Sequence, residues 1–149
     1  MKKVFLLFVL TTIAITTNSC SNDKDDIPET TYGTISMKVD GVQKTLNVYK
    51  VELIKNLEGT ADEYTQIEIS AFSKITGDRV TFSLKKGNLG NSIVGFTYLY
   101  NGDMGYLATS DFSNDVTANG DDKKLIGTFS DNSNAPYFSI TEGSFNIQY

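Results

Sequence analysis

The chain has no histidine and no tryptophan, and Cys20 is its only cysteine. Without histidine, the chain cannot build a Ser-His-Asp triad, a histidine general acid or a histidine metal site. A single cysteine cannot form an intramolecular disulfide or a zinc site made of several thiolates. The glycine patterns that bind phosphates or dinucleotides are also missing. We therefore expect that the protein is not an enzyme and has no catalytic residues, metal site or cofactor.

A catalytic site of paired carboxylates is still compatible with this composition, because two of them suffice to hydrolyse a glycosidic bond. The chain contains candidates such as Glu52, Glu63, Glu68 and Asp78, but their spacing marks no pair. A carboxylate-based hydrolase is therefore the least favoured function.

Basic residues are few, since 13 Lys and Arg stand against 18 Asp and Glu and give a net charge of −5 at pH 7. Affinity for nucleic acid comes largely from cationic side chains that neutralise phosphates. Electrostatic adhesion to anionic lipid needs clusters of the same side chains. We therefore expect no nucleic-acid partner, and no membrane attachment through surface charge.

An apolar run lies near the beginning of the chain. Lys2 and Lys3 precede the mainly apolar residues 4–15, an arrangement typical of a secretory signal peptide. The run is shorter than the ~20 apolar residues that a transmembrane helix needs. This segment therefore predicts export rather than a membrane span.

The apolar run leads into Thr17-Asn18-Ser19-Cys20. This sequence resembles the lipobox of bacterial lipoprotein precursors, although Thr17 stands where leucine is usual. In those precursors the cysteine thiol receives a diacylglyceryl group and the chain is cut before it, and the resemblance implies the same for Cys20. We expect a signal peptide over residues 1–19 and attachment to a membrane through lipid on Cys20, since two or more acyl chains give stable anchoring.

Residues 20–31 are polar and acidic, and we expect them to form a flexible tether. Within it, Lys24, Asp25 and Asp26 resemble the export signal that sends lipoproteins of Bacteroidota to the cell surface. The resemblance implies an outer-membrane protein exposed on the cell surface. The alternative is an ordinary charged linker, in which case the protein would face the periplasm.

From residue 32 to residue 149, apolar residues recur at every second position between closely spaced turn residues. This period is typical of antiparallel strands, and helical spacing is scarce. We expect a single all-β domain over residues 32–149, an antiparallel β-sandwich of about eight strands. A closed lipocalin-like β-barrel is the alternative.

Three dipeptides predict tight hairpin turns: Asp40-Gly41, Gly77-Asp78 and Asn101-Gly102. As two-residue turns, they would place Val39 opposite Val42, Ala71 opposite Leu84, and Tyr98 opposite Gly105. The apolar phase changes near Tyr49 or Lys50 and again at Gly143, which indicates β-bulges.

Residues 110–122 form a polar stretch between the expected strands. Its potential oxygen ligands for calcium are Asp111, Asp115, Asn119, Asp121 and Asp122. Their spacing fits no EF-hand loop, and Asp and Asn are common in turns. A solvated loop is therefore the preferred interpretation.

The best candidate for a ligand-binding patch is the aromatic hairpin that carries Tyr98, Tyr100 and Tyr106. Exposed tyrosines could stack on a glycan or anchor a protein partner. The structural alternative is that one face of the hairpin belongs to the core and a neighbouring strand covers the other. We prefer this alternative, and the lack of tryptophan further disfavours a sugar platform.

Three segments of the expected domain resemble uncharacterised lipoprotein families of Bacteroidota that have a C-terminal all-β domain. These segments are Met37–Gly41, Ile126–Ser130 and Ile140–Phe145. The families have no settled activity, so the resemblance implies an origin and a fold but no chemistry. The preferred function is a lipid-anchored, non-catalytic binding module of the cell envelope, and a structural envelope lipoprotein without a small ligand is the alternative.

Overall fold

The computed structural model describes residues 31–102, 104–108, 111–131 and 138–149. Within these residues every regular element is a strand, and all strand pairs are antiparallel, so the predicted all-β class is confirmed. The strands are β1 (Gly33–Val39), β2 (Val42–Asn56), β3 (Tyr64–Phe72), β4 (Arg79–Lys85), β5 (Ile93–Tyr100), β6 (Met104–Leu107), β7 (Phe112–Asn119), β8 (Lys124–Asp131) and β9 (Ile140–Gln148).

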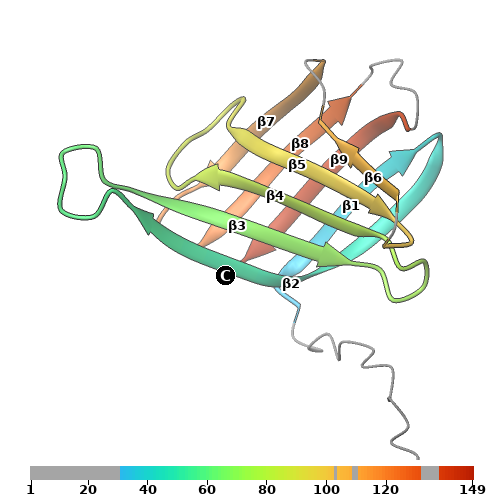
Figure 1. Ribbon diagram of the computed structural model, residues 1–149, viewed down its shortest axis with the longest axis horizontal. Helices are drawn as coiled ribbons and strands as arrows, with labels where there is room; N and C mark the ends of the chain where they lie inside the picture. Colours follow the sequence, from blue (N-terminus) through green and yellow to red (C-terminus); the bar gives the residue numbers. More distant parts are fainter. Residues whose placement is uncertain (1–30, 103, 109–110, 132–137) are drawn as a thin grey trace, which may run out of the picture.

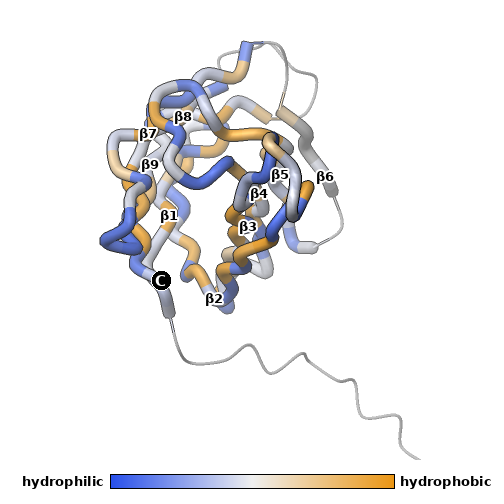
Figure 2. The backbone as a smooth tube through the Cα atoms, turned by 90° about the vertical axis from the view of Figure 1, so that its left-hand side faces the viewer, coloured by the Kyte–Doolittle hydropathy of each residue, from blue (hydrophilic) through white to orange (hydrophobic). Residues whose placement is uncertain are grey.

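All nine strands belong to one sheet, in the order β6-β5-β4-β3-β2-β1-β9-β8-β7. The sheet is strongly curled, so that its strands surround a common centre (Figure 1, Figure 2). Strand twist accumulates across a sheet of this size, and bulges add local bends. The two stacked sheets expected for a sandwich are therefore not seen in the described residues, whose strands form one continuous sheet.

The curl brings β7, at one end of the strand order, back to the chain that connects β4 with β5. Gly90 and Val116 exchange two backbone hydrogen bonds, each 2.9 Å long. At the start of β5, the backbone N–H of Ile93 donates to Asn114 Oδ1 at 3.0 Å. The middle of β7 is therefore bonded on both of its sides.

The inward-facing side chains pack into one hydrophobic core. Its largest rings are close neighbours, with Phe96 and Phe129 centroids 4.9 Å apart and Phe82 and Phe145 centroids 5.3 Å apart. The fully buried aliphatic residues around them include Ile35, Met37, Leu46, Ile67, Leu84 and Ile147. Because these side chains occupy the interior, a partner would have to bind at an end or on the outer surface of the sheet.

The first hairpin has the predicted register, with Val39 opposite Val42. The pairing of β2 with β3 shifts between Val48 and Lys50, which confirms the predicted bulge. The pairing of β8 with β9 also shifts beside Gly143, where the second bulge was expected. Both turn chemistry and hydrophobic phase were therefore reliable guides here.

The second hairpin has a different register from the one predicted. Ala71 pairs with Val80 rather than with Leu84. The chain turns through Ser73–Asp78, and a 2.9 Å backbone hydrogen bond joins the two end residues. The longer turn shifts the pairing by an even number of residues, so the same apolar side chains still face inward.

The predicted register of the third hairpin is also wrong, by one residue. Tyr98 pairs with Tyr106 rather than with Gly105, because the connection spans residues 101–103. Asn101 and Gly102 adopt φ values of 50° and 77°. Their left-handed conformations suit a three-residue hairpin connection as well as a two-residue one, so the dipeptide alone does not fix the loop length.

The polar stretch over residues 110–122 contains β7 and is not a solvated loop throughout. Its strand pairs with β8 and turns Val116 and Asn119 into the protein, whereas Ser113, Asp115 and Thr117 are exposed. A strand that buries only one face can carry polar residues at most positions, which explains why the hydrophobic pattern failed to reveal it.

Candidate functional site

The candidate site, called the rim below, consists of Lys44, Asp78, Tyr98, Tyr100 and Phe138. Successive connections in an antiparallel sheet alternate between its two ends, so the β1–β2, β3–β4 and β5–β6 turns lie together, to the right in Figure 1. Lys44 follows the first of these turns, Asp78 ends the second, and the two tyrosines precede the third.

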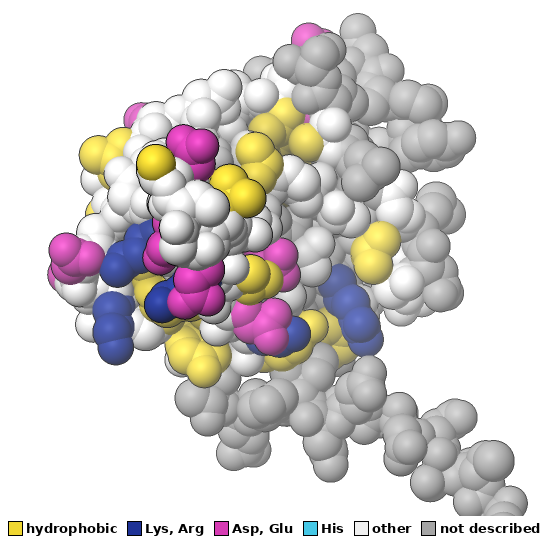
Figure 3. Space-filling model, turned by 60° about the vertical axis from the view of Figure 1, so that its left-hand side comes forward, with side chains coloured by type: hydrophobic (Ala, Val, Ile, Leu, Met, Phe, Trp, Pro, Cys, Tyr) yellow, Lys and Arg dark blue, Asp and Glu magenta, His cyan; other side chains and the backbone are white. Residues whose placement is uncertain are grey.

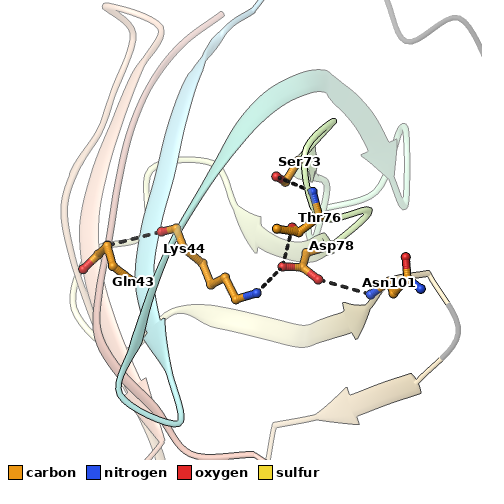
Figure 4. Close-up of polar contacts among 6 residues, drawn as sticks. All are labelled: Gln43, Lys44, Ser73, Thr76, Asp78 and Asn101. Carbon is orange, nitrogen blue, oxygen red and sulfur yellow. Dashed lines mark hydrogen bonds and ion pairs between the residues drawn. The ribbon is translucent and has the colours of Figure 1, made fainter.

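Asp78 is the centre of the rim and is fully buried. Its carboxylate accepts a hydrogen bond from Thr76 Oγ1 at 2.6 Å and lies 2.9 Å from Lys44 Nζ. It also accepts the backbone N–H of Asn101 at 3.1 Å, so it links the turns on either side of it (Figure 4). Burial alone would raise the pKa of the carboxyl. The hydrogen bonds and the Lys44 charge outweigh this effect, so the pKa of Asp78 is lowered overall.

Lys44 connects this buried carboxylate with the exposed aromatic ring of the rim. Its side chain is only 15% exposed, and Nζ lies 5.4 Å from the centroid of the Tyr100 ring, within cation–π range. The Tyr100 side chain is itself 45% exposed and its ring centroid is 6.1 Å from that of Phe138. Tyr100 is therefore held by its neighbours while part of it remains open to solvent.

Tyr98 is the fully buried aromatic residue of the rim. Its ring packs edge-on against Phe138 at a centroid distance of 5.6 Å. Its hydroxyl has no hydrogen-bond partner among the described residues. Burial raises the pKa of this hydroxyl strongly, and the nearby Asp78 charge raises it further, so the group stays protonated.

The predicted tyrosine patch is thus only partly exposed. Tyr98 is a core residue, Tyr100 is half-exposed, and the side chain of Tyr106 lies outside the described part of the structure. Two exposed apolar residues lie at the same end, namely Val42 at the start of β2, 59% exposed, and Ile75 in the β3–β4 turn, 95% exposed. The accessible surface of the rim is therefore a tyrosine accompanied by aliphatic side chains.

Sequence reasoning missed Lys44 and Asp78 as members of this site. A signal for Lys44 was present, because the predicted first hairpin placed it opposite Met37, on the buried face. A charged residue at an inward position near a strand end calls for a buried counterion. Asp78 was assigned to a tight turn, which concealed its role.

Several predicted functional residues fall elsewhere. Cys20, Lys24, Asp25 and Asp26 lie outside the described residues. Asn119, a candidate calcium ligand, instead donates its amide to the Lys85 and Asn88 carbonyls at 2.8 and 2.9 Å.

Among the residues that the structure describes, no three His, Cys, Asp or Glu side chains gather as a metal site. None of the described residues forms a helix that could cross a membrane.

Comparison of the chain with protein-family models, with curated proteins and with solved structures gave no match. Its function must therefore be inferred from its own residues and their arrangement.

Proposed function

We propose that the chain is a lipid-anchored, non-catalytic binding module that presents the rim to a protein partner. The observation that carries this proposal is the half-exposed Tyr100, fixed by Lys44 and accompanied by exposed Val42 and Ile75. Tyrosines are common anchors of protein interfaces. The preference for a protein over a glycan rests on the exposed aliphatic side chains at the same end of the sheet.

The direction of the chain supports this assignment. β1 begins at Gly33, which pairs with Val48, and ends at Val39, which pairs with Val42 beside the rim. The preceding segment, with Cys20, therefore joins the domain at the end away from the rim. A lipid on Cys20 would therefore attach the chain at the end opposite the rim, about 20 Å away along a seven-residue strand.

For the domain itself, we propose a β-barrel of about eight strands in which β6 and β7 act as one bent strand beside β5. Two backbone N–H bonds along β5 support this: Ala108 donates to the Phe96 carbonyl at 3.0 Å, and Ile93 donates to Asn114 Oδ1. A barrel of this size has an interior just wide enough for its own side chains, which fits a module that binds through its rim.

The rim is tested by comparing the wild-type chain with Tyr100→Ala on protein and glycan arrays. A protein ligand retained by wild type and lost with Tyr100→Ala supports the proposal. The matched control is Leu89→Ala, which removes a residue that is 60% exposed in the β4–β5 connection, at the opposite end. Binding of glycans alone would replace the protein partner with a sugar, and silence on both arrays would favour a structural lipoprotein.

Anchoring and surface display are tested in cells, because both depend on modification and export. Cys20→Ala should abolish labelling by a palmitate analogue, and label retained by this variant would refute lipidation at Cys20. Protease added to intact cells should cleave the wild-type protein. Replacement of Lys24, Asp25 and Asp26 by alanine should protect it, since the protein would then face the periplasm.

A further inference from the structure

The long strand β2 has an edge that the neighbouring strand β1 does not cover. β1 reaches only as far as the pair Gly33–Val48, whereas β2 continues to Asn56. In the described part of the chain, residues 50–56 pair with β3 alone. Antiparallel strands direct the main-chain groups of alternate residues to each neighbour, so every second residue here has an N–H and a C=O without a strand partner among the described residues. These residues are called the β2 edge.

The side chains of the β2 edge and its adjoining turn are unusually apolar for an exposed position. Leu53, Ile54 and Leu57 are 52%, 37% and 57% exposed. Basic and acidic side chains lie interspersed with hydrophobic ones on the side of the molecule that carries this end of β2 (Figure 3). An uncovered strand edge with exposed apolar side chains is a template for pairing with another strand.

The charges along the β2 edge and its adjoining turn alternate in sign, in the order Lys50, Glu52, Lys55 and Glu58. They now form two exposed pairs within the chain, Lys50–Glu52 at 2.9 Å and Lys55–Glu58 at 3.5 Å. The signs of these four charges are + − + − along the chain and − + − + when the same chain is read in the opposite direction. An antiparallel second copy, in the orientation that a twofold axis produces, can therefore bring Lys50 of each chain toward Glu58 of the other.

We propose that the β2 edge pairs antiparallel with the β2 edge of a second copy of this chain, with Ile54 opposite Ile54. This register places Glu52 opposite Asn56 of the second copy, and it directs Lys50 toward the turn that follows β2 in the second copy, which carries Glu58. Opposite charges directly across a strand pair stabilise it, and like charges destabilise it.

The charges also distinguish this register from its neighbours. A twofold axis at Leu53 would move Lys50 opposite Asn56 of the second copy, so the lysine would gain no acidic partner across the interface. An axis at Lys55 would place Glu52 beside Glu58 of the second copy, where the two acids repel. Lysine on a strand edge normally discourages pairing, but here Lys50 gains an acidic partner.

Charge reversal tests the proposal on the full chain, purified in mild detergent and studied by sedimentation equilibrium. Wild type should show a monomer–dimer equilibrium. Lys50→Glu and Glu58→Lys should each weaken dimerisation by about tenfold, because each puts like charges at both symmetry-related contacts. An equimolar mixture of the two variants should dimerise as wild type does, since every contact then joins a lysine with a glutamate. The double variant K50E/E58K should also recover the dimer.

The matched control is Lys74→Glu, which makes the same charge change at an exposed residue of the β3–β4 turn and should leave the dimer intact. A monomeric wild type would overturn the proposal, as would a dimer that both single variants retain. Hydrogen exchange provides the second measurement, because amides of residues 50–56 should become more protected as protein concentration rises. Protection independent of concentration would mean that another part of the same chain covers the β2 edge.

Discussion

Asp78 is the residue whose chemistry depends most on its surroundings. A fully buried carboxylate is costly unless it is ionised beside a cation and saturated with hydrogen bonds. Lys44, Thr76 and the backbone of Asn101 meet this requirement. Because these partners come from the turns and strand ends of three hairpins, the ion pair organises the rim as well as neutralising a charge.

Removal of one member of this pair should destabilise the protein strongly. Asp78→Ala leaves Lys44 largely buried without its counterion, and we expect a loss of about 3–5 kcal/mol in the free energy of unfolding. Urea unfolding followed by circular dichroism measures the effect. The exposed pair is the control, since Lys55→Ala should cost less than about 1 kcal/mol. Equal effects of the two substitutions would contradict the buried ion pair.

The lowered pKa of Asp78 has a consequence for acid stability. Its stabilising contribution is fully present above the unfolded value of about 3.9 and is lost as the pH falls through the lower folded value. Below about pH 4, the free energy of unfolding should therefore fall more steeply in wild type than in Asp78→Asn, which cannot titrate at this position. Parallel pH profiles would show that the carboxyl is not perturbed.

Substitution of Tyr98 should not reduce stability, in contrast to substitution of Asp78. A buried hydroxyl without a partner costs about 1–3 kcal/mol, so Tyr98→Phe should leave the free energy of unfolding unchanged or raise it by up to about this amount. Thermal and urea unfolding measure the change. Tyr100→Phe is the control, because its hydroxyl belongs to a half-exposed side chain and should have little effect. A clear loss of stability in Tyr98→Phe would reveal a hydrogen bond to this hydroxyl.

At the scale of elements, β8 and β9 are joined by two reciprocal glycine–phenylalanine pairs. Gly127 lies opposite Phe145, and Gly143 lies opposite Phe129. A Cβ on Gly127 would come within 2.4 Å of the Phe145 ring and within 2.7 Å of the Asp115 carbonyl oxygen. Each ring therefore occupies the space that a side chain would take on the facing strand, as in other sheets where aromatic rings cover glycines.

Gly127→Ala should consequently destabilise the sheet although its backbone conformation is an ordinary one. We expect a loss of about 1–3 kcal/mol, the usual cost of overpacking a core. Chemical denaturation measures it, and Gly127→Ala combined with Phe145→Leu should regain part of the loss because the smaller side chain makes room. Gly120→Ala is the control, since the nearest atom to its Cβ would be at 3.5 Å, an ordinary contact.

How much the sequence reveals differs from hairpin to hairpin. Asp40-Gly41 and alternating apolar residues predicted the first register, because both sources agree on one pairing. The Gly77-Asp78 dipeptide predicted the wrong register for the second hairpin. The Asp78 side chain forms contacts with distant turns, which no local pattern encodes. The polar strand β7 was missed for a similar reason, since its bonding partners near Gly90 come from a remote connection.

The candidate site was predictable only in part. Tyrosine content identified Tyr98 and Tyr100, but alternation could not tell which of these two inward positions lies deep in the core and which lies at its open end. That difference depends on where the neighbouring strands stop. The partnership of Lys44 with Asp78 likewise requires knowledge of which turns share an end of the curled sheet.

At the scale of the whole molecule, the last strand occupies a central place. β9 lies between β1 and β8 in the sheet order. It pairs residues near the end of the chain with residues near the start of the domain, such as Ile147 with Gly33. Its side chains at Ile140, Phe145 and Ile147 are buried in the common core. The domain therefore cannot complete its core until its final residues are available.

A chain that ends at residue 139 should accordingly fail to fold cooperatively. Loss of β9 removes the pairing partner of both β1 and β8 and exposes two strand edges together with the apolar residues that β9 covered. We expect a broad thermal transition and binding of a hydrophobic dye, and a synthetic peptide of residues 140–149 should restore a sharp transition. A chain with Ser144→Thr and Asn146→Thr, which changes only exposed positions of β9, is the control and should unfold sharply. A sharp transition in the truncated chain would contradict the central position of β9, because β1 and β8 would then have no strand between them and the core would be open on that side.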